Sequence, residues 1–374
     1  MRIERKNNID AFFALVRAGL WEKEERLAKF GAFDFSEVKK LAEEQSVVGL
    51  VAAGLGHISD VEVPKSIVLQ FIAQTLQLEQ RNSAMNHFIA DLVAQMYKEG
   101  IYTLLVKGQG IAQCYERPLW RACGDVDLFF SKDNYYKAKS FLYSKAVSIV
   151  EENKKVLHLG LTIGPWLVEL HGSLRSRCLL KMDHLIDIIQ DDIFCGRAVR
   201  TWMNGNTPIY VPAPNNDVVI IFTHIIKHFF RGGIGLRQIC DWCRLLWTYR
   251  DTIDRELLEK RIRTYGLLTE WRAFGVFVVN YLGFPIEAMP LYSKDKRWLK
   301  KARRINSFVI NVGNFGHNRD LSYYSNRSFL TRKAISLWRH TKDSINHVLI
   351  FPIDSIRVWV GIIQKGAFAV LKGK

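Results

Sequence analysis

The spacing of apolar residues predicts a helical first quarter of the chain. Apolar positions in residues 8–98 recur at the three- and four-residue intervals of amphipathic helices. A capping-box-like sequence at 34–37 predicts a helix that runs to residue 53. Pro64 then opens a much longer helical pattern, which Gly100 stops. We therefore expect helices alone before residue 100.

A different pattern begins at residue 101. Residues 101–106 form an unbroken apolar run of strand length, whereas 125–130 and 166–171 alternate between apolar and polar positions. Residues 146–150 and 156–163 also have the composition of strands, and a helix is expected at 134–144. We expect the strands at 101–106, 125–130 and 166–171 to lie side by side in one mixed sheet.

Helical patterns return after residue 217 and continue to the end of the chain. The predicted class is therefore α+β, with a mixed β-sheet core flanked by N-terminal and C-terminal helical regions. Four segments follow from these patterns. They are a helical region at 1–99, the sheet core at 100–213, a helical domain packing on the core at 214–290, and a basic helical region at 291–374.

Composition and charge add a basic C-terminal region to this picture. The chain has 374 residues, is 48% hydrophobic and 24% charged, and is thus expected to be ordered with more than one core. From residue 290 onward, 17 lysines or arginines stand against four aspartates, so this region holds 13 of the 16 net positive charges. Apolar residues accompany them. The region fits an amphipathic segment on an anionic membrane surface, a nucleic-acid contact, or a basic helical surface whose apolar stripe packs on the protein itself.

The cysteines and the N-terminus indicate a reducing compartment. Six cysteines are scattered without the spacing of a disulfide scaffold, and the first residues lack the apolar core of a signal peptide. A cytoplasmic protein is expected. Cys240 and Cys243 have CxxC spacing but lie in an amphipathic run, so core packing is expected rather than redox or zinc chemistry.

Candidate chemistry gathers at the ends of the predicted strands. The 101–106 strand runs into Lys107-Gly108-Gln109-Gly110, where two glycines let backbone N–H groups turn toward an anion such as phosphate. Asp125 and Asp127 share one face of the next strand, about 6–7 Å apart at Cα. Two carboxylates on one edge suit a divalent cation such as Mg²⁺, because leaving both ionised without a cationic partner is costly.

Further polar side chains project from the later elements. Glu169 and His171 share one face of the 166–171 strand, and His158 on the preceding strand either faces the same cleft or is structural. His224 and His228 are one helical turn apart; metal ligation, a structural role and a substrate-facing polar face all remain open. Arg237 and Asp241, at the same spacing, are expected to form an ion pair.

Four phrases carry a resemblance to a known family: LLVKGQGIAQCY, RACGDVDLFF, VELHG and GLRQICDWCRLL. They resemble a bacterial family of largely uncharacterised nucleotidyltransferases, within the superfamily of the DNA-polymerase-β type. Its pattern runs Lys-Gly, then Arg-x-x-Gly-Asp-x-Asp, then Glu-x-His. The similarity covers roughly residues 30 to 250.

The resemblance implies a nucleotidyltransferase-like core and a role for each matching residue. Asp125, Asp127 and Glu169 would be the catalytic, metal-binding carboxylates, with Mg²⁺ or Mn²⁺ as cofactor. The nucleotide would be contacted by six other positions, namely Lys107, Gly108, Gln109, Arg121, Gly124 and His171. Gln109 stands where the superfamily usually has serine.

The implied activity is transfer of a nucleoside monophosphate from an NTP to an unidentified hydroxyl or phosphate acceptor. The alternative is a catalytically degenerate binding or scaffold protein of the same fold, at the membrane surface. In either case the protein is expected in the cytoplasm, or peripherally at the inner face of the membrane. If the aspartates serve a cation, Asp125→Asn and Asp127→Asn should both stop activity while the metal-free protein melts at the wild-type temperature or above.

Overall fold

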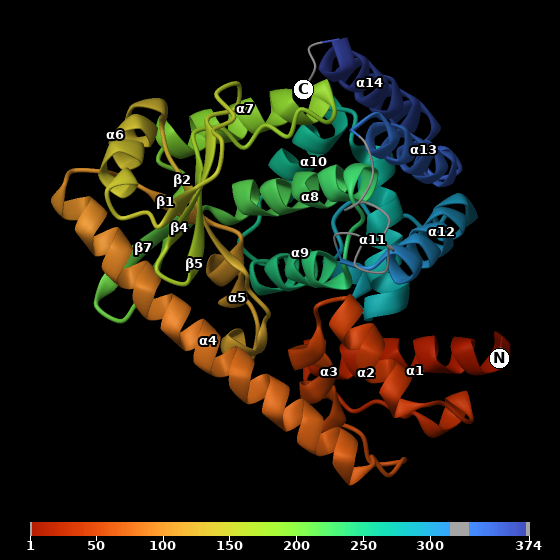
Figure 1. Cartoon of the computed structure of the whole chain (residues 1–374). Helices are drawn as coiled ribbons and strands as arrows, with labels where there is room; N and C mark the ends of the chain where they lie inside the picture. Colours follow the sequence, from red (N-terminus) through yellow and green to blue (C-terminus); the bar gives the residue numbers. More distant parts are fainter. Residues whose placement is uncertain (1, 315–328, 372–374) are drawn as a thin grey trace.

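A seven-stranded mixed sheet lies at the centre of the computed structural model, which describes residues 2–314 and 329–371. The strand order is β3-β4-β5-β2-β1-β7-β6. The strands are β1 (Leu104–Val106), β2 (Asp125–Phe129), β3 (Ser148–Ile149), β4 (His158–Ile163), β5 (Trp166–His171), β6 (Val199–Asn204) and β7 (Thr207–Pro212). Helices flank this sheet (Figure 1), so the predicted α+β class is confirmed.

The three strands expected side by side are neighbours in the order β5-β2-β1. Strands β2 and β5 pair in parallel with Asp127 opposite Glu169, and β1 pairs antiparallel to β2 with Val106 opposite Asp127. Strand β1 starts later than predicted, and the Tyr102 N–H donates to Asn134 Oδ1 instead of to a strand. This register brings the end of β1 to the two acidic strands.

The two faces of the sheet bury different cores. On one face, Val126 and Val168 join a core with apolar residues of the long helix α4 (Lys65–Lys98) and of α6 (Lys132–Tyr143). On the other face, Phe129 joins the core that contains α7 (Leu180–Phe194) and α8 (Pro214–Arg231). Because side chains alternate along a strand, Asp125 and Asp127 share the face of Phe129 and point toward α8.

The helices before the sheet follow the prediction with one exception. They are α1 (Arg2–Trp21), α2 (Phe35–Glu44), α3 (Val48–Leu55) and α4, with a short 3-10 turn η1 (Ala28–Phe30). The Asp34 side chain caps α2 by accepting from the Ser36 N–H, and α4 begins after Pro64 as expected. The expected single helix to residue 53 is wrong, because the chain breaks at Ser46, whose φ is 55°. The neighbouring Gln45 side chain hydrogen-bonds to the backbone of Val309 and Leu236, so tertiary contacts override the helical pattern there.

The helices after the sheet pack around buried aromatic side chains, including Trp242 and Trp271. They are α9 (Leu236–Thr248), α10 (Arg255–Thr264), α11 (Leu268–Leu282), α12 (Lys296–Val312), α13 (Phe329–Val348) and α14 (Pro352–Leu371). Cys240 and Cys243 are both buried in this core, as expected. Residues of α1, α8, α9, α11, α12 and α14 belong to one continuous core, and the boundaries at 99, 213 and 290 stay predictions.

Two short helices and a last 3-10 turn complete the described chain: α5 (Gly108–Ala112), η2 (Pro118–Trp120) and η3 (Ile286–Ala288). The hairpin of β6 and β7 was not among the strands expected from sequence. Among the described helices, none has the length and apolarity that a membrane span requires.

Candidate active site

A tight turn places Lys107 at the end of β1. Both Lys107 and Gly108 have positive φ angles, 59° and 43°. A Cβ atom on Gly108 would lie 3.3 Å from Cys123 Sγ and 3.6 Å from the Asp125 carbonyl oxygen, so glycine permits the turn to pack on the start of β2. Lysine in this conformation is unusual, and such backbone strain is concentrated at functional sites.

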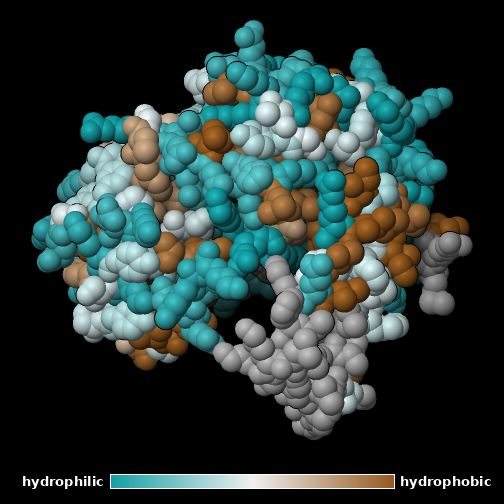
Figure 2. All heavy atoms as spheres, turned by 90° about the horizontal axis from the view of Figure 1, so that it is seen from above, coloured by the Kyte–Doolittle hydropathy of each residue, from teal (hydrophilic) through white to brown (hydrophobic). Residues whose placement is uncertain are grey.

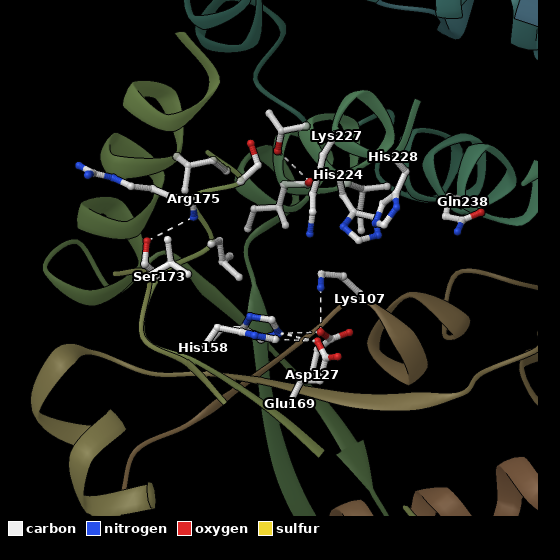
Figure 3. A pocket seen from close by; sticks show the side chains of 18 of the residues that line it. Lys107, Asp127, His158, Glu169, Ser173, Arg175, His224, Lys227, His228 and Gln238 are labelled. Carbon is white, nitrogen blue, oxygen red and sulfur yellow. Dashed lines mark hydrogen bonds and ion pairs between the residues drawn. The ribbon is translucent and has the colours of Figure 1, made fainter. Parts of the chain in front are cut away.

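Three carboxylates meet beside this turn. Ligand oxygens of Asp125, Asp127 and Glu169 all lie within 4.8 Å of one another. The parallel pairing of β2 and β5 produces this cluster, because it sets Asp127 directly opposite Glu169. The predicted proximity of Glu169 to both aspartates is confirmed. Figure 3 shows Glu169 beside Asp127.

Asp127 is surrounded by cationic and hydrogen-bonding groups. Lys107 Nζ donates to Asp127 Oδ1 at 2.8 Å, and His171 Nε2 lies 2.7 Å from the same oxygen. Burial alone would raise the pKa of Asp127, but Lys107 and His171 outweigh it and hold that pKa well below its usual range. The pKa of Lys107 is raised: burial would lower it, but the charge of Asp127 outweighs that effect. Asp127 is therefore ionised and already paired.

Asp125 and Glu169 differ from Asp127. The carboxylate of Asp125 makes no hydrogen bond or ion pair with any described residue, and burial followed by the charge of Asp127 raises its pKa. The pKa of Glu169 is lowered, chiefly by the hydrogen bond from His158, whose Nε2 lies 3.1 Å from Glu169 Oε2. Asp125 is thus the carboxylate that lacks a cationic partner.

The carboxylates line a cavity of about 1100 Å³ whose opposite wall is basic. Helix α8 contributes His224, Lys227, His228 and Arg231 to this wall, and α9 contributes Arg237. Lys227 and the two histidines point from α8 toward Lys107 and the acidic cluster (Figure 3). Sequence reasoning missed Lys227 and Arg231, although the spacing 224, 227, 228 and 231 forms one polar stripe on an otherwise apolar helix.

Burial changes the charge of this wall. The pKa of Lys227 is lowered by burial and then by the positive charge of Lys107. Burial also moves the pKa of His224 well below its normal value and lowers that of His228 to about 3. Both histidines are therefore neutral near neutral pH. Both face the cavity, as the substrate-facing alternative anticipated, and no described residue completes a metal site around them.

Arg121 has a different partner from the one expected. Its guanidinium donates two hydrogen bonds to the Asp241 carboxylate, at 3.0 and 2.6 Å, and both side chains are buried. The Tyr115 hydroxyl donates to the same carboxylate. The expected ion pair between Arg237 and Asp241 is therefore wrong, and Arg237 donates to the Ala122 carbonyl oxygen. Arg121 still borders the cavity, but its charge is neutralised by Asp241.

Two of the predicted nucleotide contacts lie elsewhere. The Gln109 side chain turns into the core, where its Nε2 donates to Asn82 Oδ1 of α4 at 2.9 Å. Gly124 precedes β2, and neither residue lines the cavity. A buried amide requires hydrogen-bond partners, and α4 supplies one for Gln109. Lys107, Gly108, Arg121 and His171 do line the cavity.

The donor set fits a hard divalent cation. Carboxylate oxygens are the ligands that Mg²⁺ and Mn²⁺ prefer, and three of them converge from two rigid strands. The unpaired Asp125 supports the same conclusion, because a buried carboxylate without a partner favours a bound cation.

The mixed sheet, the glycine turn and the acidic cluster together define a nucleotidyltransferase-like protein. A family model described as "uncharacterised nucleotidyltransferase" matches residues 31–283, which is more than half of the chain, and the chain belongs to this family. The match begins where the sequence resemblance began and extends through the whole of α11. Comparison with curated proteins and with solved structures gives no match.

Proposed function

We propose that this protein is a metal-dependent nucleotidyltransferase of the DNA-polymerase-β-type superfamily, from a bacterial family. It would transfer a nucleoside monophosphate from an NTP to a hydroxyl or phosphate acceptor. One observation carries the proposal: three converging carboxylates face a basic wall across a single cavity. A cation site beside an anion-binding surface is what a metal-bound triphosphate requires.

Asp125, Asp127 and Glu169 would hold Mg²⁺ or Mn²⁺. Such ions, when bound, neutralise the phosphate oxygens and align the attacking and leaving groups. Lys107 now pairs with Asp127, and once Asp127 ligates a cation the ammonium of Lys107 is free to donate to a phosphate oxygen. The strained turn at Lys107 and Gly108 would hold this ammonium beside the acidic cluster.

The basic wall would bind the remaining negative charge. Lys227 makes no ion pair with a described residue, so its partly buried ammonium is available to an anionic substrate. Neutral His224 and His228 can each donate one hydrogen bond without adding charge. Arg121 and Asp241 would have a structural role, because their buried ion pair joins α9 to the loop before β2.

The alternative is a protein that binds nucleotide without transferring it. One observation favours it: the residue at the position of the usual serine, Gln109, is turned away from the cavity. In this alternative the acidic cluster and the basic wall would still bind metal and NTP, and no labelled product would form.

Incubation with each α-labelled NTP, Mg²⁺ or Mn²⁺ and a fractionated cell lysate tests the proposal. The wild type should transfer label to an acceptor, and thermal shift should show stabilisation by NTP only with the metal. Asp125→Asn should lose both effects, and the exposed Asp251→Asn is the matched control that should keep both. Metal-dependent stabilisation without labelled product would favour the binding alternative, and no effect of NTP with metal would exclude both.

A further inference from the structure

Two histidines stand beside the acidic cluster in a second potential ligand set. His158 on β4 and His171 on β5 are directly paired across the antiparallel strands, and their ring centroids are 4.9 Å apart. The Nε2 atoms lie 3.1 Å and 3.5 Å from Glu169 Oε2. One ligand atom from each of the three residues lies within 4.8 Å of the other two.

These separations match the edges of a metal coordination polyhedron. Two ligands bound at about 2.1 Å and at octahedral or tetrahedral angles are roughly 3.0–3.4 Å apart. Imidazole nitrogen suits transition ions such as Mn²⁺, Co²⁺ and Zn²⁺, whereas Mg²⁺ prefers oxygen ligands alone. The two sets therefore differ in the ions that they select.

We propose that His158, Glu169 and His171 form a second cation site, which takes a transition ion and shares Glu169 with the oxygen-only set of Asp125, Asp127 and Glu169. This second site extends the proposed function. It rests on that proposal for the role of the oxygen-only set as the site of the nucleotide-bound ion. To enter the second site, a metal replaces the contact between His171 Nε2 and Asp127 Oδ1, which leaves Lys107 as the remaining partner of that oxygen. On binding, a doubly protonated ring releases its Nε2 proton to solvent, whereas a neutral ring that carries its proton on Nε2 changes to the tautomer protonated on Nδ1.

Metal binding tests this site without reference to turnover. Metal-free protein is titrated with Mn²⁺ or Co²⁺, and nitrogen ligation is read from pulsed electron paramagnetic resonance of Mn²⁺ or from the absorption bands of Co²⁺. His158→Phe preserves the ring beside His171 but removes Nε2, so the two-imidazole signal should be lost. Asp125→Asn is the matched control, because it alters only the oxygen set and should retain that signal.

Three outcomes would overturn the second site. They are the absence of nitrogen ligation in the wild type, its persistence unchanged in His158→Phe, and its loss in Asp125→Asn. The Mg²⁺-dependent stabilisation by NTP is measured on the same samples. If the wild type shows nitrogen ligation but no Mg²⁺-dependent stabilisation by NTP, the proposed function is refuted and the second site is not. Failure of the second site and failure of the proposed function can therefore be distinguished.

A separate observation concerns the surface of α13 and α14. In α14 the face that packs on the protein carries Asp354 and Ser355 beside Phe351, whereas the outward face carries Ile353, Ile356 and Val360, which are 66%, 54% and 40% exposed. Trp338, Ile345 and Leu349 are likewise exposed on one face of α13 and the turn that follows it. Val358 on the inner face joins the core, so α14 carries apolar residues on both its inner and its outer face, unlike an ordinary surface helix.

Cations accompany this apolar surface. Arg357 is exposed between Ile353 and Val360, and the Lys342 ammonium lies over the Trp338 ring. Hydrophobic residues gather on the face of the molecule that carries α13 and α14 (Figure 2). One alternative from sequence has the apolar residues of this region pack on the protein itself. Val358 does so, whereas Ile353 and Ile356 do not pack on the described part of the protein.

We propose that this face of α13 and α14 docks on an anionic lipid surface, with the aliphatic side chains entering the interface and the cations contacting headgroups. Apolar burial together with positive charge is what such binding requires. A second copy of the chain is disfavoured, because each copy brings the same excess of positive charge, 13 in the region after residue 290. Nucleic acid would use the cations but leave the isoleucines exposed.

Vesicle binding of the full chain tests this surface. Vesicles of phosphatidylcholine alone are compared with an equal mixture of phosphatidylcholine and phosphatidylglycerol, and we expect binding to the mixture that weakens with salt. Ile353→Ser with Ile356→Ser should reduce binding at least about tenfold. Leu69→Ser with Ile72→Ser is the matched control, because these α4 residues are similarly exposed, at 66% and 48%.

Brominated lipid should quench the emission of Trp338 in the wild type, and Trp338→Phe should lose that part of the quenching. The proposal would be overturned if the α14 and α4 double variants bound vesicles equally well. It would also be overturned if the wild type formed a dimer that the α14 double variant abolished. Tight binding to RNA or DNA that the α14 double variant retains, with no binding to vesicles, would identify nucleic acid as the partner instead. Circular dichroism shows whether each variant is folded.

Discussion

Lys107 Nζ lies 2.8 Å from Oδ1 of Asp127, and the two side chains are 17% and 5% exposed. The protein thus neutralises Asp127 with its own lysine when no metal is bound. Asp125, two residues earlier on the same strand, has no such partner among the residues that the structure describes. The two aspartates of the same motif therefore have different roles in the metal-free protein, although alternation along β2 makes them equivalent in sequence.

Replacing each aspartate by asparagine should separate these roles. Asp127→Asn leaves Lys107 buried without its counter-ion and should lower the free energy of unfolding by about 3 kcal/mol. Asp125→Asn removes a carboxylate whose pKa is raised by burial and by Asp127, so its stability should equal or exceed that of the wild type. Chemical denaturation with a chelator present measures both. This revises the expectation from sequence, which was the same for both variants; equal stabilities would contradict the structural argument.

Lys107 should affect metal and nucleotide in opposite directions. Its ammonium occupies the carboxylate oxygen that a cation would use, so Lys107→Met should bind Mn²⁺ at least as tightly as the wild type. The same variant should bind NTP in the presence of Mn²⁺ about tenfold more weakly, because a charge-assisted hydrogen bond to phosphate is lost.

Isothermal titration with Mn²⁺ alone, and then with a non-hydrolysable NTP, separates the two effects. Lys155→Met, at another lysine that lines the cavity, is the matched control. It should change the affinities for Mn²⁺ and for NTP less than Lys107→Met does. Weaker binding of Mn²⁺ by Lys107→Met would mean that Lys107 positions Asp127 for the metal rather than competing with it.

The acidic half of the site could be predicted from sequence because local rules determine it. Alternation places Asp125 with Asp127 and Glu169 with His171, and both strands have distinctive apolar partners that set their register. Parallel pairing of β2 and β5 was the only non-local step. The expected neighbouring strands placed Glu169 near the aspartates, whereas its role as the third carboxylate was implied by the family resemblance.

The basic half could not be predicted in the same way. Lys227 belongs to the site only because α8 crosses the end of the sheet, and that packing depends on contacts far along the chain. Arg121 pairs with Asp241, 120 positions away, and this partner outcompetes the expected i,i+4 pair with Arg237. Gln109 turns inward because Asn82 of α4 accepts its amide. Side chains with several possible partners are decided by tertiary contacts rather than by spacing.

Lys227 offers a test of the basic wall. Its ammonium is partly buried, its pKa is lowered by burial and by Lys107, and it has no ion pair among the described residues. Lys227→Met should therefore leave the metal-free protein as stable as the wild type, or more stable, while weakening binding of NTP with metal about tenfold. A thermal shift with and without ligand gives both values. If stability and binding fell together, Lys227 would serve the fold rather than a substrate.

A last prediction concerns the attachment of α14. One ammonium, that of Lys181 on α7, contacts the carboxylates of both Glu270 on α11 and Asp354 on α14. Lys181 is shared between the two carboxylates, and the exposed Arg357 lies 3.6 Å from Asp354 alone, so Glu270 is the one that retains its proton. Burial, followed by the hydrogen bond with Asp354, raises the pKa of Glu270 from 4.5 to about 8, and the pKa of Asp354 is lowered by its hydrogen bonds to Glu270 and Lys181 despite burial.

The sign of the pH dependence follows from the proton on Glu270. Between about pH 4.5 and about pH 8, the folded protein binds a proton on Glu270 that the unfolded chain has released. The free energy of unfolding therefore falls as pH rises through this interval, and the stabilisation by this proton is lost above about pH 8. Glu270→Gln keeps a neutral hydrogen-bonding group and should remove this decline, and the exposed Glu287→Gln is the matched control. Hydrogen exchange at α14 and thermal melting, each below and above that pH, measure the effect. In the wild type, α14 should exchange faster above pH 8 than in Glu270→Gln; identical pH profiles for the two proteins would show that Glu270 does not hold the proton.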